Sequence, residues 1–325
     1  MKFHKLDSVT KDLGGFTVGR LLPQLHLKHA GPFVFLDHMG PATFAPGKGM
    51  DVRPHPHIGL STVTYLFSGK IHHKDHLGFS QDIAPGDVNW MTAGKGIVHS
   101  ERTPADLRAK GQDLHGLQMW VALPKDDEDC EPSFHHHPKE TLPTWIEQDH
   151  SLRLILGQAF RHRSPVKTYS KMFYVDVHPK TNHTLSLEGF LTDQLELKNQ
   201  LSLAIYPLRG EVEIQAPASI FSKIETLNHS SHPNPRKIGP RQIGCLQIAA
   251  DEAKEILPQI SLKSSPDSGP AHYVLFGGED FPEERFLFWN FVSSSKDKIE
   301  DAKKKWQDQT MGKIEGETEF IPLPS

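Results

Sequence analysis

The stretch PGDVNWMTAGKGIVHSE, residues 85–101, holds the pattern that decides the fold. Its first residues, PGD at 85–87, predict a turn into the short apolar run Val88–Met91. The residues GKG at 94–96 then predict a tight bend, which is followed by HSE at 99–101. Short strands separated by glycine and proline turns are typical of a barrel or a sandwich. The stretch therefore indicates an all-β protein.

Period-two alternation of apolar residues recurs along the rest of the chain. Between residues 61 and 67, for example, Val63, Tyr65 and Phe67 lie on one face of a predicted strand. The segments of this character are Ser61–Phe67, Leu117–Leu123, Leu152–Leu156, Met172–Val177, Leu201–Tyr206, Ile243–Ile248 and Phe286–Val292. Turn residues separate these segments, which favours an all-β fold built from many short strands.

One clear helical pattern lies near the carboxyl end, at residues 294–310. Ile299, Ala302 and Trp306 repeat there on one helical face. Ser294 and Asp297 stand at a spacing that resembles a capping box. We therefore expect a helix that packs its apolar face against the outside of a sheet.

Length and composition narrow the class of protein. A chain of 325 residues corresponds to about two domains. The net charge of −4 provides no basic field for nucleic acid, and no apolar run approaches the ~20 residues of a spanning helix. The two cysteines are too few for a cysteine-only metal site and fit a reducing compartment. We expect a cytoplasmic monomer without nucleic-acid or membrane partners.

One short pattern occurs twice in the chain. Residues 65–72, YLFSGKIH, resemble residues 206–213, YPLRGEVE, and each predicts a strand, a glycine turn and a second strand. Two copies of one β-unit would account for both the length and the strand content. We therefore expect two domains, residues 1–130 and 131–325, with the helix at 294–310 in the second.

The strongest chemical signal is His55-Pro56-His57 followed by His99-Ser100-Glu101. Alternate residues of a strand point to the same side, so the members of each pair project together. Two such strands side by side would offer three imidazoles and one carboxylate. This donor set suits iron, copper, nickel or zinc and leaves positions open for substrate, as in a catalytic rather than a structural metal site.

Five segments of the chain together resemble the pirin family of the cupin superfamily. They are GPFVFLDHMGP (31–41), HPH (55–57), TVTYLFSG (62–69), PGDVNWMTAGKGIVHSE (85–101) and LFWNFVSSSKDKIEDAKKKW (287–306). The resemblance covers nearly the whole chain and is tightest over residues 31–121. It implies a bicupin, in which two β-barrel (jelly-roll) domains pack together and only the amino-terminal one holds metal.

The resemblance also implies a site and an activity. By motif position the metal ligands are His55, His57, His99 and Glu101, and the metal is Fe(II), with Ni, Cu, Mn or Zn as alternatives. The implied activity is that of a quercetin 2,3-dioxygenase, with a flavonol-like aromatic and dioxygen as substrates and Glu101 as the catalytic base. The alternative is a non-enzymatic redox- or metal-sensing module that binds a partner protein.

Three further residues are expected next to the ligands. Pirins typically read Arg-Gly-Phe-Glu after HPH, whereas this chain has Ile58 and Ser61 at the two charged positions. We expect the mouth of the pocket to be more apolar and flavonol turnover to be weaker than in relatives that keep both charges. His73 lies in a run that resembles a family motif, and it is expected either to support a ligand or to lie at a solvated hairpin tip.

The second half of the chain lacks the same metal motif. Residues at the corresponding offsets before Tyr206 are Glu196 and Lys198, and no HxH or HxE occurs after residue 140. We therefore expect the carboxyl-terminal cupin domain to lack metal ligands.

Overall fold

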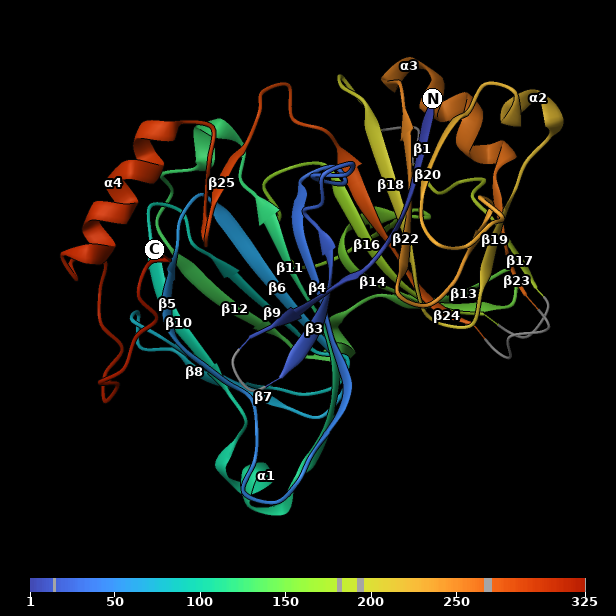
Figure 1. Ribbon diagram of the computed structural model, residues 1–325. Helices are drawn as coiled ribbons and strands as arrows, with labels where there is room; N and C mark the ends of the chain where they lie inside the picture. Colours follow the sequence, from blue (N-terminus) through green and yellow to red (C-terminus); the bar gives the residue numbers. More distant parts are fainter. Residues whose placement is uncertain (14–15, 180–182, 192–195, 266–270, 325) are drawn as a thin grey trace. The chain divides into compact units, whose positions relative to one another are not determined.

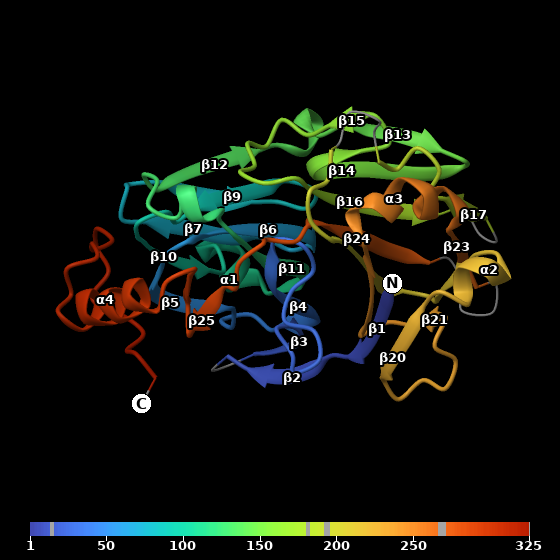
Figure 2. The same cartoon turned by 90° about the horizontal axis from the view of Figure 1, so that it is seen from above.

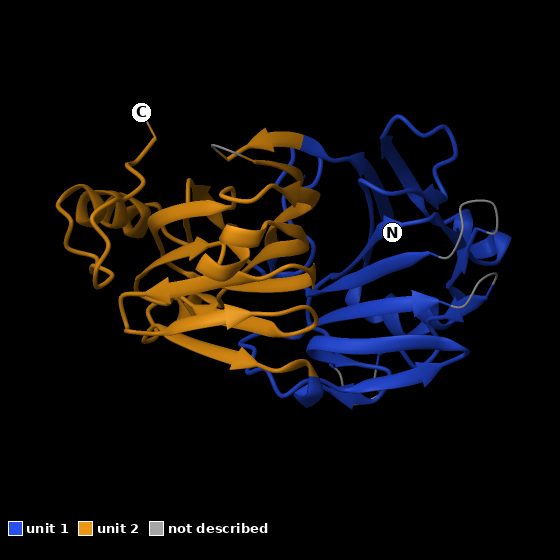
Figure 3. Cartoon of the chain, turned by 90° about the horizontal axis from the view of Figure 1, so that it is seen from below, with its two compact units in different colours: residues 1–9, 21–33, 140–282 blue, residues 10–20, 34–139, 283–325 orange. Residues whose placement is uncertain are grey.

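The computed structural model describes residues 1–13, 16–179, 183–191, 196–265 and 271–324. The chain divides into two compact units, each assembled from three segments (Figure 3). Unit 1 comprises Met1–Val9, Leu21–Phe33 and Glu140–Pro282, and unit 2 comprises Thr10–Arg20, Val34–Lys139 and Glu283–Ser325. Each unit includes segments from both the amino-terminal and the carboxyl-terminal part of the chain. The domain boundary expected near residue 130 stays a prediction.

Unit 2 is built from two main sheets and a hairpin (Figures 1 and 2). The larger sheet follows the order β12 (Ser133–His137), β9 (Val88–Thr92), β6 (Leu60–Ser68), β11 (Gln112–Ala122), β4 (Phe33–Phe44), β3 (Thr17–Leu22) and β2 (Val9–Asp12). The smaller sheet follows the order β5 (Asp51–His57), β10 (Ile97–Arg102), β7 (Ile71–Asp75) and β8 (Ser80–Ile83). The hairpin consists of β25 (Phe286–Phe288) and β26 (Phe291–Ser293).

Unit 1 likewise contains a large and a small sheet. The large sheet follows the order β13 (Thr144–Glu147), β14 (His150–Ala159), β16 (Met172–Pro179), β24 (His272–Glu279), β18 (Leu201–Arg209), β22 (Gln242–Ile248), β1 (Lys2–Asp7) and β20 (Glu225–His229), with β15 (His162–Arg163) on β14. The small sheet follows the order β17 (Thr184–Ser186), β23 (Ser261–Ser264), β19 (Val212–Gln215) and β21 (Lys237–Ile238). Alternate residues of β16, such as Val175 and Val177, are fully buried in the apolar core of this unit.

The helices are few and short. They are α1 (Ala105–Lys110), α2 (Ala218–Phe221), α3 (Ala250–Ile256) and α4 (Lys296–Gln307), with 3-10 turns at η1 (Lys125–Asp127), η2 (Lys139–Thr141) and η3 (Leu257–Gln259). In the described part of the chain, none of them has the length and apolar character that crossing a bilayer requires. The predominance of strands confirms the all-β class.

Helix α4 buries the predicted face, Ile299, Ala302 and Trp306, against apolar residues of unit 2. The predicted cap is wrong, because the N-cap residue is Ser295 and its side chain makes no capping hydrogen bond. Ser294 is instead held by the buried carboxylate of Glu128, which accepts from its backbone amide at 2.6 Å and its hydroxyl at 3.2 Å. Burying a carboxylate without hydrogen-bond donors costs free energy, so Ser294 serves the Glu128 carboxylate and not the end of the helix.

Two features bear directly on the sequence patterns. The repeated YLFSG and YPLRG motifs both form a strand that turns at a glycine of positive φ, Gly69 and Gly210, into a second strand. The segment Phe286–Val292, expected as one strand, is the β25–β26 hairpin, and its turn contains Trp289 at φ 52°. The single-strand prediction was therefore wrong at this position.

Candidate metal centre

Strands β5 and β10 of unit 2 place the predicted histidines side by side. The two strands pair antiparallel, with His99 opposite His55 and Ile97 opposite His57. The register shifts between His99 and Glu101, so Glu101 stands opposite Val52. The pairing brings the two motifs next to each other. The backbone bend that precedes His99 is tightly packed at Gly94 (φ 50°). A Cβ atom at this position would lie 1.9 Å from the carbonyl oxygen of Cys130.

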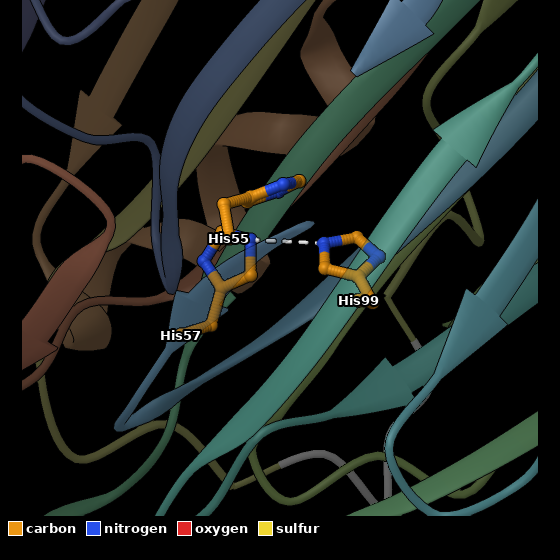
Figure 4. Close-up of side chains that lie close together, drawn as sticks. All are labelled: His55, His57 and His99. Carbon is orange, nitrogen blue, oxygen red and sulfur yellow. Dashed lines mark hydrogen bonds between the residues drawn. The ribbon is translucent and has the colours of Figure 1, made fainter. Parts of the chain in front are cut away.

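The three imidazoles converge on one point (Figure 4). A ring nitrogen from each of His55, His57 and His99 lies within 4.8 Å of the other two, and all three residues are buried. The Nε2 atoms of His57 and His99 are 3.1 Å apart. Ligand nitrogens around a single transition ion lie at such distances, since each metal–nitrogen bond is about 2.0–2.1 Å long.

Each of the three rings has its Nδ1 atom engaged elsewhere. His55 Nδ1 donates to the carbonyl oxygen of Arg53 at 2.8 Å, and His57 Nδ1 donates to that of Asn290 at 3.1 Å. His99 Nδ1 lies 3.4 Å from Nδ1 of His73. A proton on Nδ1 leaves Nε2 with a free lone pair, so these contacts set the tautomer that metal binding requires.

His73 in turn is fixed by a buried carboxylate. Its Nε2 donates to Asp75 Oδ2 at 2.9 Å, while Asp75 Oδ1 accepts the backbone amides of Leu77 and Phe79 at 2.9 and 3.1 Å. His73 Nδ1 is then the acceptor for the proton on His99 Nδ1. His73 is 3% exposed, so the structure places it beside a histidine of the cluster and not at a solvated hairpin tip.

Burial keeps the histidine cluster uncharged. Desolvation lowers the pKa of His55 to about 4 and holds the pKa values of His57 and His99 well below their usual range. The Nε2 atoms of His57 and His99 therefore face each other as two lone pairs, which repel unless a cation or a proton lies between them. This donor set fits a divalent transition ion.

Glu101 lies beside the cluster but outside the set of mutually close ligand atoms. It is 9% exposed, and desolvation raises its pKa to about 7. The hydroxyl of Thr64 is 3.4 Å from Glu101 Oε1 and donates at 2.7 Å to Gln118 Oε1. Glu101, His55 and His57 all line one cavity of about 670 Å³.

Aromatic and paired charged residues form the wall of this cavity. Phe35 and Trp120 stack with ring centroids 3.9 Å apart, and the Trp120 ring meets His57 edge-on at 5.0 Å. Arg20 lies over the Phe35 ring at 4.5 Å and forms two 2.8 Å hydrogen bonds with Asp37. Contacts thus run along the wall from the Arg20–Asp37 pair through Phe35 and Trp120 to His57.

Ile58 and Ser61 lie away from the cavity wall. Ile58 packs with Val98 and Trp306 in the apolar cluster under α4 and lines a separate cavity of about 110 Å³. Ser61 is fully buried, and its hydroxyl lies 3.0 Å from that of Thr92. The large cavity is lined by other residues, Arg20 and Asp37 among them.

Most of the cavity wall is not predictable from local sequence patterns. Phe35 reads as core from the sequence, and nothing local marks Arg20 or Asp37. Gln118 and Trp120 carried a usable signal, because they alternate with the apolar face of β11 and so had to point to the other side of the sheet.

In the second half, Glu196 and Lys198 are exposed and precede β18.

Two family models match the chain, Pirin over residues 15–121 and Pirin C-terminal cupin domain over residues 240–312. A pirin-like protein of Caulobacter vibrioides is 42% identical, and the match covers 98% of each chain. Pirin of Homo sapiens is 28% identical over 89% of this chain and 85% of its own. The crystal structure of a quercetin 2,3-dioxygenase from Acinetobacter baumannii has a TM-score of 0.81 at 26% identity, covering 100% of this chain and 95% of that one.

These matches confirm both the resemblance and the bicupin fold that it implied. They extend over both halves of the chain, and the amino-terminal model includes the segments that contain His55, His57, His99 and Glu101. The chain belongs to the pirin family.

Proposed function

We propose that this protein is a metal-dependent dioxygenase of the quercetin 2,3-dioxygenase type, acting on a flavonol-like aromatic. The observation that carries the proposal is the convergence of three uncharged imidazoles of unit 2, two of which line a 670 Å³ cavity with an aromatic wall. The likeness to the Acinetobacter baumannii quercetin 2,3-dioxygenase supports it.

The metal is proposed to be a single Fe(II), with Ni, Cu, Mn or Zn as alternatives. His55, His57 and His99 would hold it through Nε2, and Glu101 is the proposed fourth ligand. When bound, such an ion supplies Lewis acidity to a substrate hydroxyl and the electron chemistry that dioxygen needs. The backbone carbonyls of Arg53 and Asn290 and the buried ring of His73 hold the three rings in the orientation for binding.

The cavity wall binds and orients the substrate. A planar flavonol would lie along the Phe35–Trp120 stack, where flat aromatic surfaces pack favourably. The charge of Arg20 is already paired, because its Nε and Nη2 atoms donate to the two carboxylate oxygens of Asp37. Recognition therefore rests on shape and stacking rather than on clamping an anion.

Glu101 is the proposed proton acceptor. It lines the same cavity as His55 and His57, so a substrate hydroxyl directed at the cluster passes its carboxylate. Thr64, which is held by a hydrogen bond to Gln118, contacts that carboxylate and restricts its position. Removal of the hydroxyl proton by Glu101 prepares the substrate for reaction with dioxygen.

The test is a dioxygen-uptake assay on protein of known metal content. The protein is expressed without added nickel, its metals are measured by elemental analysis, and a panel of flavonols is supplied under air. We expect about one transition ion per cluster, and dioxygen consumption in step with flavonol loss and carbon monoxide release. His57→Ala should lose both the ion and turnover, whereas His135→Ala, at an exposed position on β12, should keep both.

The second candidate is the metal- or redox-sensing module. Its distinguishing result is a fully loaded cluster that consumes no dioxygen with any flavonol. A total metal content in His57→Ala equal to that of the wild type would contradict the ligand assignment on which both candidates rest.

A further inference from the structure

A second group of ligand side chains lies in unit 1, on the large sheet. Asp176 and His178 belong to β16 and His272 begins β24. One carboxylate oxygen and one ring nitrogen from each histidine lie within 4.8 Å of one another. Asp176 and His178 form a DxH pattern, which differs from the HxH and HxE patterns of the first half of the chain.

The strand geometry explains why these three side chains meet. Val175 and Val177 point into the core of unit 1, so Asp176 and His178 point to the opposite face of the sheet. The ladder between β16 and β24 pairs Asp176 with Val274 and Val177 with Tyr273. One further step along an antiparallel ladder sets His178 against His272, and their rings stack with centroids 4.0 Å apart.

The donor atoms of the group already face one another. His178 Nε2 lies 3.2 Å from Asp176 Oδ2, and His272 Nε2 lies 2.6 Å from Asp176 Oδ1. Ligands on a tetrahedral zinc ion, with bonds of about 2.0–2.1 Å, are separated by roughly 3.4 Å. A small rotation of the side chains would therefore admit an ion between the carboxylate and the two rings.

Burial gives this carboxylate a strong need for positive charge. Asp176 is 2% exposed, and an isolated charge at such a position is costly unless it is paired. Although burial opposes ionisation, the hydrogen bonds from His178 and His272 hold the pKa of Asp176 well below its usual range. A divalent ion would supply the same compensation in place of histidine protons.

The group is also accessible. The side chain of His178 is 53% exposed and that of His272 is 13% exposed, so an ion can enter past His178 and keep water in its remaining coordination positions. The hydrogen bond to Asp176 raises the pKa of His178 above its usual range, and the charges of Arg153 and Arg209 oppose this rise by repulsion. The same repulsion acts on a bound cation, so binding here is expected to be weaker than at the histidine cluster of unit 2.

We propose that Asp176, His178 and His272 form a second transition-metal site, which takes Zn²⁺ or an ion of similar ligand preference. Nitrogen and carboxylate donors in this ratio suit zinc, and three protein ligands leave one tetrahedral position for water or an exogenous ligand. The bound ion would tie the end of β16 to the start of β24. The proposal is independent of the dioxygenase function, since it concerns residues of the other unit.

The test is zinc stoichiometry on the full chain. Protein stripped with a chelator is dialysed against Zn²⁺, and bound zinc is measured by elemental analysis. The wild type should bind two equivalents. His178→Gln, at a half-exposed position that tolerates substitution, should bind one, His57→Ala should bind one, and the double variant should bind none. Zinc should also raise the thermal midpoint of His57→Ala but not that of the double variant.

A matched control addresses the exposed histidines of β12. His135→Gln should still bind two equivalents, because His135 belongs to neither group. Loss of the second equivalent in His135→Gln, or two equivalents in His178→Gln, would overturn the proposal. So would a wild type that binds a single equivalent which His57→Ala removes. With Co²⁺ in place of Zn²⁺, His57→Ala should show a visible absorption band. Adding His178→Gln to this variant should abolish the band.

Discussion

His99 and His73 lie with their Nδ1 atoms 3.4 Å apart, so that a histidine of the cluster is held by a second, buried histidine. His73 itself is anchored on Asp75, whose other carboxylate oxygen accepts two backbone amides. The chain of contacts runs from the turn after β7 to the cluster. It fixes the orientation of the His99 ring without involving any residue of the cavity wall.

The first prediction concerns this contact. His73→Leu should weaken metal binding at the cluster about 10- to 100-fold, because the partner that fixes the tautomer of a metal-binding histidine typically contributes that much. Competition with a chelator of known affinity measures the change. His73→Gln, which can still accept from His99, should recover part of the affinity. The control is His72→Leu, since the neighbouring His72 points to Asp82 and Ser80. Equal losses in His72→Leu and His73→Leu would contradict the positioning role.

The second prediction separates the two roles proposed for Glu101. Glu101→Gln preserves size and removes the charge. If Glu101 acts as the proton acceptor, the variant should keep the metal and lose about 100-fold or more in dioxygen uptake. Elemental analysis and uptake on the same sample measure both quantities. Glu131→Gln, at an exposed carboxylate paired with Lys95, should leave both unchanged. Loss of the ion in Glu101→Gln would instead favour the ligand role.

The third prediction concerns the Arg20–Asp37 pair. Burial raises the pKa of Asp37, and Arg20 opposes this rise. Arg20→Met should therefore lower the free energy of unfolding by about 2 kcal/mol at pH 7.5, because it leaves a buried carboxylate without its partner. A carboxyl group whose pKa is higher in the folded than in the unfolded state lowers the stability of the protein as the pH rises through the range between these two pKa values. The cost should shrink as the pH falls through the raised pKa of Asp37, because the protonated carboxyl group carries no charge.

Chemical denaturation at several pH values measures this effect. The double variant Arg20→Met/Asp37→Leu is the control, because it removes the carboxylate as well. It should be more stable than Arg20→Met at pH 7.5 and should not share the recovery of Arg20→Met at low pH. A cost of Arg20→Met that is the same at pH 7.5 and pH 4.5 would show that Asp37 does not carry it.

The fourth prediction returns the family residue to position 58. Ile58 is 7% exposed in the apolar cluster under α4. Ile58→Arg should lower the free energy of unfolding by about 2 kcal/mol or more, because it introduces a charge among apolar side chains. Flavonol turnover per bound metal should change little, since residue 58 does not line the large cavity. Ile58→Leu is the size-matched control. A clear rise in turnover for Ile58→Arg would restore the view that this residue shapes the mouth.

The sequence by itself determined the all-β class and the positions of the metal motifs. Both follow from local rules. Period-two alternation marks strands, glycine turns punctuate them, and HPH and HSE place alternate side chains on one face. The buried face of α4 was predictable for the same reason, since Ile299, Ala302 and Trp306 follow the helical period. Each of these features depends on residues only a few positions apart.

Only the tertiary structure decided what surrounds those motifs. Asn290, which accepts from His57, is 233 residues away in the chain, and Arg20 and Trp120 reach the cavity from different strands. The pairing of β16 with β24 brings His272 to Asp176 across almost a hundred residues. No local pattern encodes such contacts, because they depend on which strands become neighbours. That choice is made by the burial of apolar surface across the whole sheet, of which each segment of sequence contains only a part.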